Sequence, residues 1–193
     1  MTMRTCLLSL ALAFVPLVAR ASIVVALLEP ELIAVADTIV FGEVLHTRAV
    51  VKAPRGAVAT EVVLQVYQGL RGARDGEVLT LEVPGGRLSS GLVANSAGAP
   101  TFTPGEMVFV FLTTAGGVRR PYGLAYGVLR ARPDRGSWVL RRDASDLIYW
   151  DQSGAPVDAA LTRLEDVPLA VLADRVRRRL LELSLPGAHE VRP

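Results

Sequence analysis

Few side chains in the sequence have the types and spacing that a reaction centre needs. The two histidines, His46 and His189, each lack a second metal-binding side chain at ligand spacing. Three serines, Ser89, Ser90 and Ser96, fall in a stretch rich in Gly, Ser and Ala, without the G-x-S-x-G context of a nucleophile. We therefore expect no catalytic residue, no metal site and no cofactor.

Three acidic residues offer the main catalytic alternative. Asp143, Asp146 and Asp151 are close enough in sequence to suggest an enzyme built on loop carboxylates, or a calcium site. The apolar run between Asp146 and Asp151 breaks the ligand spacing that calcium sites use. Solvated loop acids are the better interpretation.

Aromatic residues in turn-rich stretches are the stronger candidates for a binding surface, because their rings combine apolar area with a polar edge. Burial in a small core is the alternative for each of them, and we expect it for Trp150 and for Phe109. The aromatics considered are Phe102, Tyr122, Tyr126, Tyr149 and Trp150, and the candidate binding residues are Ser22, Arg87, Phe102, Tyr122 and Tyr126.

Residues 1–21 have the order of a secretory signal peptide. Arg4 precedes the apolar run CLLSLALAFVPLVA, and Ala19-Arg20-Ala21 provides a small-x-small cleavage site. Cleavage between Ala21 and Ser22 predicts a mature protein that is secreted or periplasmic, without stable membrane insertion. An uncleaved N-terminal anchor is the alternative, although the run is short for a membrane span.

Loss of the leader changes the cysteine count and the charge. It removes Cys6, the only cysteine, so the mature chain has neither a disulfide nor a thiolate. It also removes Arg4 and Arg20 from the 21 basic residues, while all 19 acidic residues stay. A nearly neutral chain with 6% aromatic residues argues against a nucleic-acid partner.

Two long alternating runs organise the mature chain. Residues 38–51 (TIVFGEVLHTRAVV) and 59–69 (ATEVVLQVYQG) show period-two patterning and are separated by a turn containing Pro and Gly, which predicts an antiparallel pair. Residues 107–113 (MVFVFLT) are apolar enough for a strand buried on both faces. Further strands are expected at residues 77–83, 122–132 (bent at Gly123 and Gly127), 137–142 and 146–151, the last as the arm of a short hairpin.

The stretch at residues 85–104 is longer than an ordinary connection. Loops of this length are usually functional or disordered, so a mobile surface loop and a binding loop both remain open.

Two helices are expected, one near each end of the mature chain. Acidic residues favour a short helix at 30–36, and residues 22–28 before it form a strand or lead into it. A longer helix at 167–183, with Asp166 as N-cap and an early Pro168, has an apolar stripe flanked by arginines. An ordinary packing face explains the stripe better than a membrane surface does. The stripe consists of Leu169, Leu172, Val176, Leu180 and Leu183.

These observations predict a mainly β domain over residues 22–185, formed as a single antiparallel β-barrel with a short N-terminal and a C-terminal amphipathic helix. Residues 186–193 are expected to form a flexible tail.

The segments ADTIVFGEV (residues 36–44), TEVVLQV (60–66), APTFTPGEMVFVFL (99–112) and YGLAYGVLRAR (122–132) resemble uncharacterised exported bacterial proteins with an OB-fold barrel. Such barrels are similar to the N-terminal domain of tissue inhibitors of metalloproteinases and to netrin-like modules. This resemblance implies an OB-like barrel. Those inhibitors bind the protease zinc through an N-terminal cysteine held by disulfides, whereas Ser22 stands at the expected mature N-terminus here.

The sequence therefore predicts an exported, non-catalytic binding module, whose partner is a protein bound through residues 85–104 or the N-terminal segment. An inhibitor or accessory protein of an exported metalloprotease and a structural component of the cell envelope are the alternatives.

Overall fold

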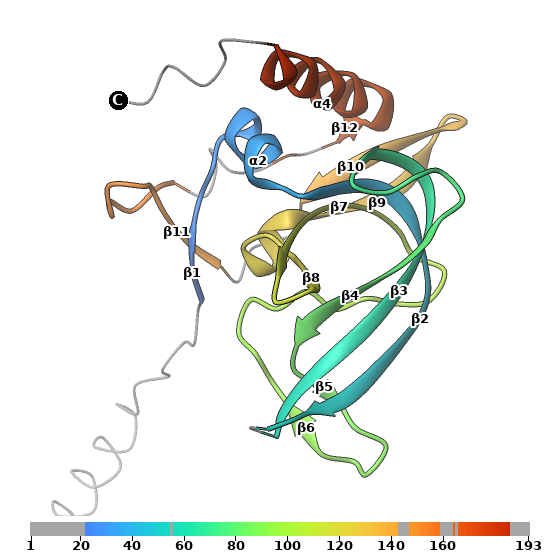
Figure 1. Ribbon diagram of the computed structural model, residues 1–193, viewed down its shortest axis with the longest axis vertical. Helices are drawn as coiled ribbons and strands as arrows, with labels where there is room; N and C mark the ends of the chain where they lie inside the picture. The colour runs from blue at the N-terminus through green and yellow to red at the C-terminus, as the bar shows by residue number, and fades with distance from the viewer. Residues whose placement is uncertain (1–21, 55, 143–146, 159–163, 165, 186–193) are drawn as a thin grey trace, which may run out of the picture.

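The computed structural model describes residues 22–54, 56–142, 147–158, 164 and 166–185, and this part of the chain is mainly β with two helices. One large antiparallel sheet dominates (Figure 1), with the strand order β12-β10-β9-β7-β2-β3-β4 and with β8 beside β7. Its strands are β2 (Thr38–Lys52), β3 (Ala57–Arg71), β4 (Val78–Pro84), β7 (Met107–Ala115), β8 (Val118–Pro121), β9 (Val128–Asp134), β10 (Ser137–Arg142) and β12 (Val167–Pro168).

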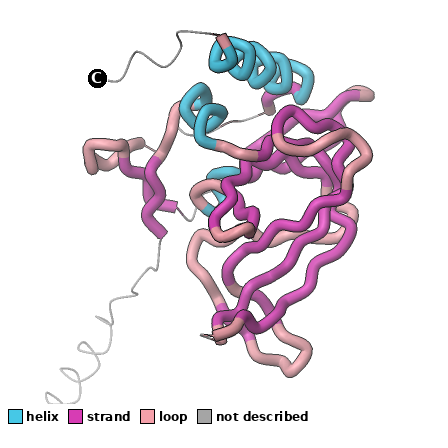
Figure 2. The backbone as a smooth tube through the Cα atoms, viewed as in Figure 1, coloured by secondary structure: helices cyan, strands magenta, loops and turns pink. Residues whose placement is uncertain are grey.

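The long pair β2–β3 forms as the alternating pattern predicts, and it bends the sheet. Its register shifts between Ile39 and Val40, between Phe41 and Gly42, and between Val44 and His46. Register irregularities of this kind increase the twist of a strand pair. Figure 2 shows the strands curling round, so that β4 and β8 come into contact although they are not paired.

Charged side chains strengthen this region on the sheet surface. Lys52 of β2 pairs with Glu61 at 2.9 Å and also with Glu82, which Arg120 of β8 approaches at 3.6 Å. The hydrogen bonds to Glu82 and Glu61 raise the pKa of Lys52. The hydrogen bonds from Lys52 and then Arg48 lower the pKa of Glu61. The network therefore links β2, β3, β4 and β8 without backbone pairing between the last two.

Strand β7 is buried on both faces, which confirms the expectation from its continuous apolar run. Phe109 and Phe111 enter a helix-side cluster that contains residues of both helices, whereas Val108, Val110 and Leu112 enter a strand-side cluster on the opposite face. Because successive side chains of a strand point to opposite faces, a strand between two apolar layers needs apolar residues at every position.

The helices cover the helix-side cluster. Helix α2 spans Glu29–Val35 and α4 spans Leu169–Ser184, and their contact includes an Arg175–Glu29 ion pair at 3.3 Å. Leu172 and Val176 are fully buried, so the apolar stripe of α4 is a packing face as predicted. Neither helix of the described residues has the length and apolarity that a membrane crossing requires.

The expected N-cap of α4 is wrong. Pro168 occupies that position, while Asp166 has a left-handed φ of 53° and pairs with Arg132 of β9 at 2.9 Å. An ion pair to β9 therefore replaces the hydrogen bond of a side-chain cap, and β12 pairs with β10 immediately before the helix begins.

The strand expected at residues 122–132 begins later than predicted. Gly123 and Leu124 have left-handed φ values of 55° and 61°, which an extended strand does not accommodate. The short 3₁₀ helix η2 (Leu124–Gly127) follows, and β9 starts at Val128.

Strand β11 (Leu147–Trp150) pairs in parallel with β1 (Ser22–Val25), a pairing that the expected short hairpin arm does not include. The chain does turn after Trp150 and forms a bridge from that residue to Pro156. Pairing with β1 depends on a partner more than 100 residues away, which local patterning does not reveal.

Candidate functional site

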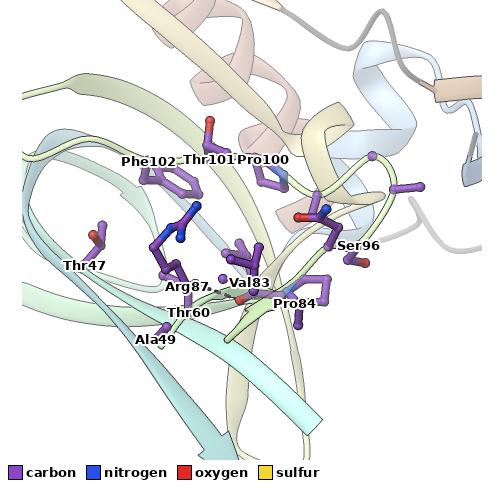
Figure 3. Close-up of a pocket in the computed structure, with 18 of the residues that line it drawn as sticks. Thr47, Ala49, Thr60, Val83, Pro84, Arg87, Ser96, Pro100, Thr101 and Phe102 are labelled. Atoms are coloured by element: carbon purple, nitrogen blue, oxygen red, sulfur yellow. Dashed lines mark hydrogen bonds between the residues drawn. The ribbon is translucent and has the colours of Figure 1, made fainter. Parts of the chain in front are cut away.

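A groove with a volume of about 830 Å³ lies between the β2–β3 pair and the segment that follows β4. Figure 3 shows side chains from both sides converging on it. The described residues that line the groove are Thr47, Ala49, Thr60, Val83, Pro84, Gly85, Gly86, Arg87, Val93, Ala94, Asn95, Ser96, Ala97, Gly98, Ala99, Pro100, Thr101, Phe102, Leu147 and Ile148.

The segment over the groove has regular structure of its own. Strands β5 (Gly86–Arg87) and β6 (Val93–Ala94) pair as a small hairpin, inside which the Leu88 N–H donates to the Leu92 carbonyl at 2.9 Å. Residues 85–104 are therefore not one unstructured loop; the sequence did not indicate this hairpin, because a two-residue strand is too short to show period-two patterning.

One end of the segment is fixed tightly to the sheet. The Thr60 hydroxyl donates to the Gly85 carbonyl at 2.8 Å, and the Gly85 N–H donates to the Val58 carbonyl at 2.9 Å. Gly86 has a φ of 137°, and a Cβ there would lie 2.3 Å from Thr60 Oγ1. The backbone at Gly86 therefore lies directly on β3, and only glycine fits this contact.

The other end is held by an arginine–glutamate pair. Arg130 of β9 forms an ion pair with Glu106 and also donates to the Thr101 carbonyl at 2.7 Å. The Glu106 carboxylate accepts the Thr103 N–H at 3.2 Å, which closes the turn before β7. These contacts position Phe102, whose half-buried ring packs against the strand-side cluster.

The groove combines one cation with apolar and neutral polar groups. Among the described residues that line it, Arg87 is the only one with an ionisable side chain, and it is exposed. Its guanidinium points toward the Phe102 ring across the opening (Figure 3). Hydroxyl and amide groups of Thr47, Asn95 and Thr101 add neutral donors and acceptors. This lining suits recognition of a neutral or anionic segment.

The structure brings together two of the five predicted binding residues, Arg87 and Phe102. Ser22 begins β1 opposite Leu147, which lines the groove. Tyr122 lies outside the groove, where its hydroxyl donates to the Val25 carbonyl at 3.4 Å.

Tyr126 was wrongly expected on an exposed binding surface. It is only 2% exposed and belongs to the helix-side cluster, where its hydroxyl donates to the Leu27 carbonyl. Tyr149 is also buried, whereas Trp150, which was expected in the core, is 36% exposed; Phe109 is fully buried as expected.

Tyr126 also borders a second cavity of about 450 Å³ beside α2, together with the buried Arg142. The Arg142 guanidinium stacks 4.1 Å from the centroid of the Tyr126 ring, and burial lowers the pKa of this arginine. Asp151 accepts hydrogen bonds from the N–H and hydroxyl of Ser153 and from the Ala155 N–H, which lower its pKa. These contacts give Asp151 a structural role in a turn.

The remaining chemical candidates do not form a site in the described part of the chain. His46 is exposed on β2, and no group of three His, Cys, Asp or Glu residues suited to a metal ion occurs among the described residues. Asp143, Asp146 and His189 lie outside those residues, as do the proposed leader and the C-terminal tail.

Sequence reasoning missed most of the polar lining of the groove. Thr47 and Thr60 were not singled out, because threonine is common in strands and carries no pattern that distinguishes a wall residue. No protein-family model, curated protein or solved structure matches this chain.

Proposed function

We propose that this protein is an exported, non-catalytic binding module whose groove holds an extended segment of another protein. Export is supported by the signal-peptide pattern of residues 1–21, with cleavage between Ala21 and Ser22. Recognition of a polypeptide is supported mainly by the lining of the groove.

Small residues along one wall favour a polypeptide ligand. Ala94, Ala97, Gly98 and Ala99 leave the backbone of this wall accessible, so that a second main chain can approach closely. Neutral polar groups provide hydrogen bonds for such a main chain, while Phe102 and Ile148 provide apolar contacts for its side chains. Arg87 would select neutral or acidic residues over basic ones.

We extend the proposal to the fold, as an OB-like barrel. The curl of the sheet, the contact of β4 with β8 and the approach of Arg120 to Glu82 support this assignment. The resemblance to the barrel of metalloproteinase inhibitors supports the same fold. The proposed binding at the groove rests on its lining and not on this resemblance.

The experiment is a selection for peptides that bind the protein. Peptides of about twelve residues, which span roughly 40 Å when extended, are selected from a random phage-displayed library. The target is expressed from the full-length sequence and purified after export. Affinities of labelled synthetic peptides are then measured by fluorescence anisotropy.

We expect Arg87→Glu and Phe102→Ala each to weaken binding about tenfold or more, as for contacts near the centre of an interface. The matched controls are Arg178→Glu on α4 and Tyr67→Ala on β3, which are exposed and outside the groove. Failure to select any peptide, or equal binding by the groove and control variants, would contradict the proposed function.

A further inference from the structure

The β1–β11 pair carries an exposed apolar face. Ile23 lies opposite Ile148, and Val25 lies opposite Trp150, so these four side chains share one side of the two strands. Their exposed fractions are 62%, 45%, 42% and 36%. We call this surface the ribbon face; the two strands that carry it lie beside the main sheet in Figure 1.

No described residue covers the ribbon face in the way that parallel strands are normally covered. Parallel sheets are usually buried on both faces. The opposite side of this pair is buried, since Val24, Leu147 and Tyr149 belong to the helix-side cluster. In the described part of the chain β1 pairs with β11 alone, and neither strand contains a charged residue.

The size of the ribbon face argues against a second copy of this chain as its partner. Four side chains at these exposures present on the order of 400 Å², so a symmetric dimer would bury roughly 800 Å², below the size of a stable interface. An apolar patch of several hundred Å² on a monomer often marks a binding site.

The ribbon face is continuous with the groove through β11. Leu147 and Ile148 line the groove, and Ile148 also lies on the ribbon face beside Ile23. We propose that the partner segment held in the groove continues over the ribbon face and covers it with apolar side chains. This inference rests on the proposed function and adds that the partner carries an apolar stretch next to the groove-binding residues.

The chain contains a reporter for this contact. Its two tryptophans are Trp138, half-buried against Phe41, and Trp150 on the ribbon face. In a Trp138→Phe variant, emission therefore comes from Trp150 alone. The probes are the phage-selected peptides. We expect them to shift Trp150 emission to shorter wavelengths, because binding removes water from the ring.

A ribbon variant provides the second measurement. Ile23→Asp should weaken peptide binding about tenfold, although Ile23 does not line the groove. Val78→Asp on β4 is the matched control, because Val78 is an apolar strand residue that is 53% exposed elsewhere. The Trp150 measurement needs no ribbon substitution, so it remains valid if Ile23→Asp fails to fold.

The outcomes separate the two proposals. Loss of binding in the groove variants, with unchanged Trp150 emission and normal binding by Ile23→Asp, would overturn the ribbon inference and leave the proposed function intact. A shift of Trp150 emission without loss of peptide binding in the groove variants would overturn both proposals. It would show that the peptide does not occupy the groove and therefore does not continue from the groove over the ribbon face. Sedimentation as a dimer that Ile23→Asp dissociates would assign the ribbon face to a second copy and overturn the inference.

Discussion

Replacing Gly86 by alanine should loosen the groove from the sheet and destabilise the protein. Gly86 has a φ of 137°, and an added Cβ would lie 2.3 Å from Thr60 Oγ1 and 3.0 Å from Ala49 Cβ. The Thr60 hydroxyl is held by its hydrogen bond to the Gly85 carbonyl at 2.8 Å, so it cannot move away without losing that bond.

Two costs add at this position. A non-glycine residue in an unfavourable backbone conformation costs about 1–3 kcal/mol. Overpacking against Thr60 and Ala49 costs about 1–3 kcal/mol more. The free energy of unfolding should therefore fall by about 2–6 kcal/mol. Lifting the backbone off β3 would reduce the clash, but it would also displace Arg87 and weaken peptide binding.

Urea denaturation of five proteins measures the packing cost separately: the wild type, Gly86→Ala, Thr60→Ala, the double variant Gly86→Ala/Thr60→Ala, and Gly91→Ala. Thr60→Ala alone should cost about 1 kcal/mol through its lost hydrogen bond. In the double variant the short contact is gone, so the two substitutions together should cost at least about 1 kcal/mol less than their sum. Gly91→Ala is the control for backbone conformation alone, because Gly91 has a φ of 88° and no atom lies within 4 Å of its added Cβ.

Equal destabilisation by Gly86→Ala and Gly91→Ala would refute the packing argument. Additivity of Gly86→Ala and Thr60→Ala within about 0.5 kcal/mol would refute it as well, because it would show no contact between the two positions.

Three further predictions test the leader, the surface network and the core. The exported protein should begin at Ser22, and intact-mass spectrometry that finds residues 1–21 retained would contradict this. Because its folded-state pKa is lowered by Lys52, Glu61 contributes stability above its unfolded pKa of about 4.3, and this contribution is lost as the pH falls through the lower folded value. Lys52→Met should therefore show a smaller loss of unfolding free energy than the wild type between about pH 6 and about pH 3, and equal losses in urea titrations would argue against the network. Tyr126→Phe leaves the buried Leu27 carbonyl without the hydroxyl that donates to it, so the free energy of unfolding measured with urea should fall by about 1–3 kcal/mol. An unchanged urea midpoint would show that this hydrogen bond contributes nothing to stability.

Local patterning was sufficient for the main strands and for α4. The alternation in β2 and β3 and the continuous apolar run of β7 reflect burial on one face or on both, which the sequence records directly. The stripe of α4 predicted its buried face for the same reason.

Long-range partners were not predictable in this way. The parallel pairing of β1 with β11 leaves Trp150 partly exposed, although its large apolar ring predicts a place in the core. The sequence predicts both Arg87 and Phe102 as binding residues, but their meeting at the groove depends on the β5–β6 hairpin and on the Arg130–Glu106 pair. Asp166 has the residue type of an N-cap, yet its carboxylate forms an ion pair with Arg132 of β9 instead.

The most direct test of the central claim is a comparative affinity capture from the exported proteins of the source cell. The wild type, the double groove variant Arg87→Glu/Phe102→Ala and the double control Arg178→Glu/Tyr67→Ala serve as baits, and mass spectrometry identifies the captured proteins. We predict one exported protein that the wild type and the control capture and the groove variant does not. Equal capture by all three baits, or no specific capture by any, would contradict a protein-binding groove.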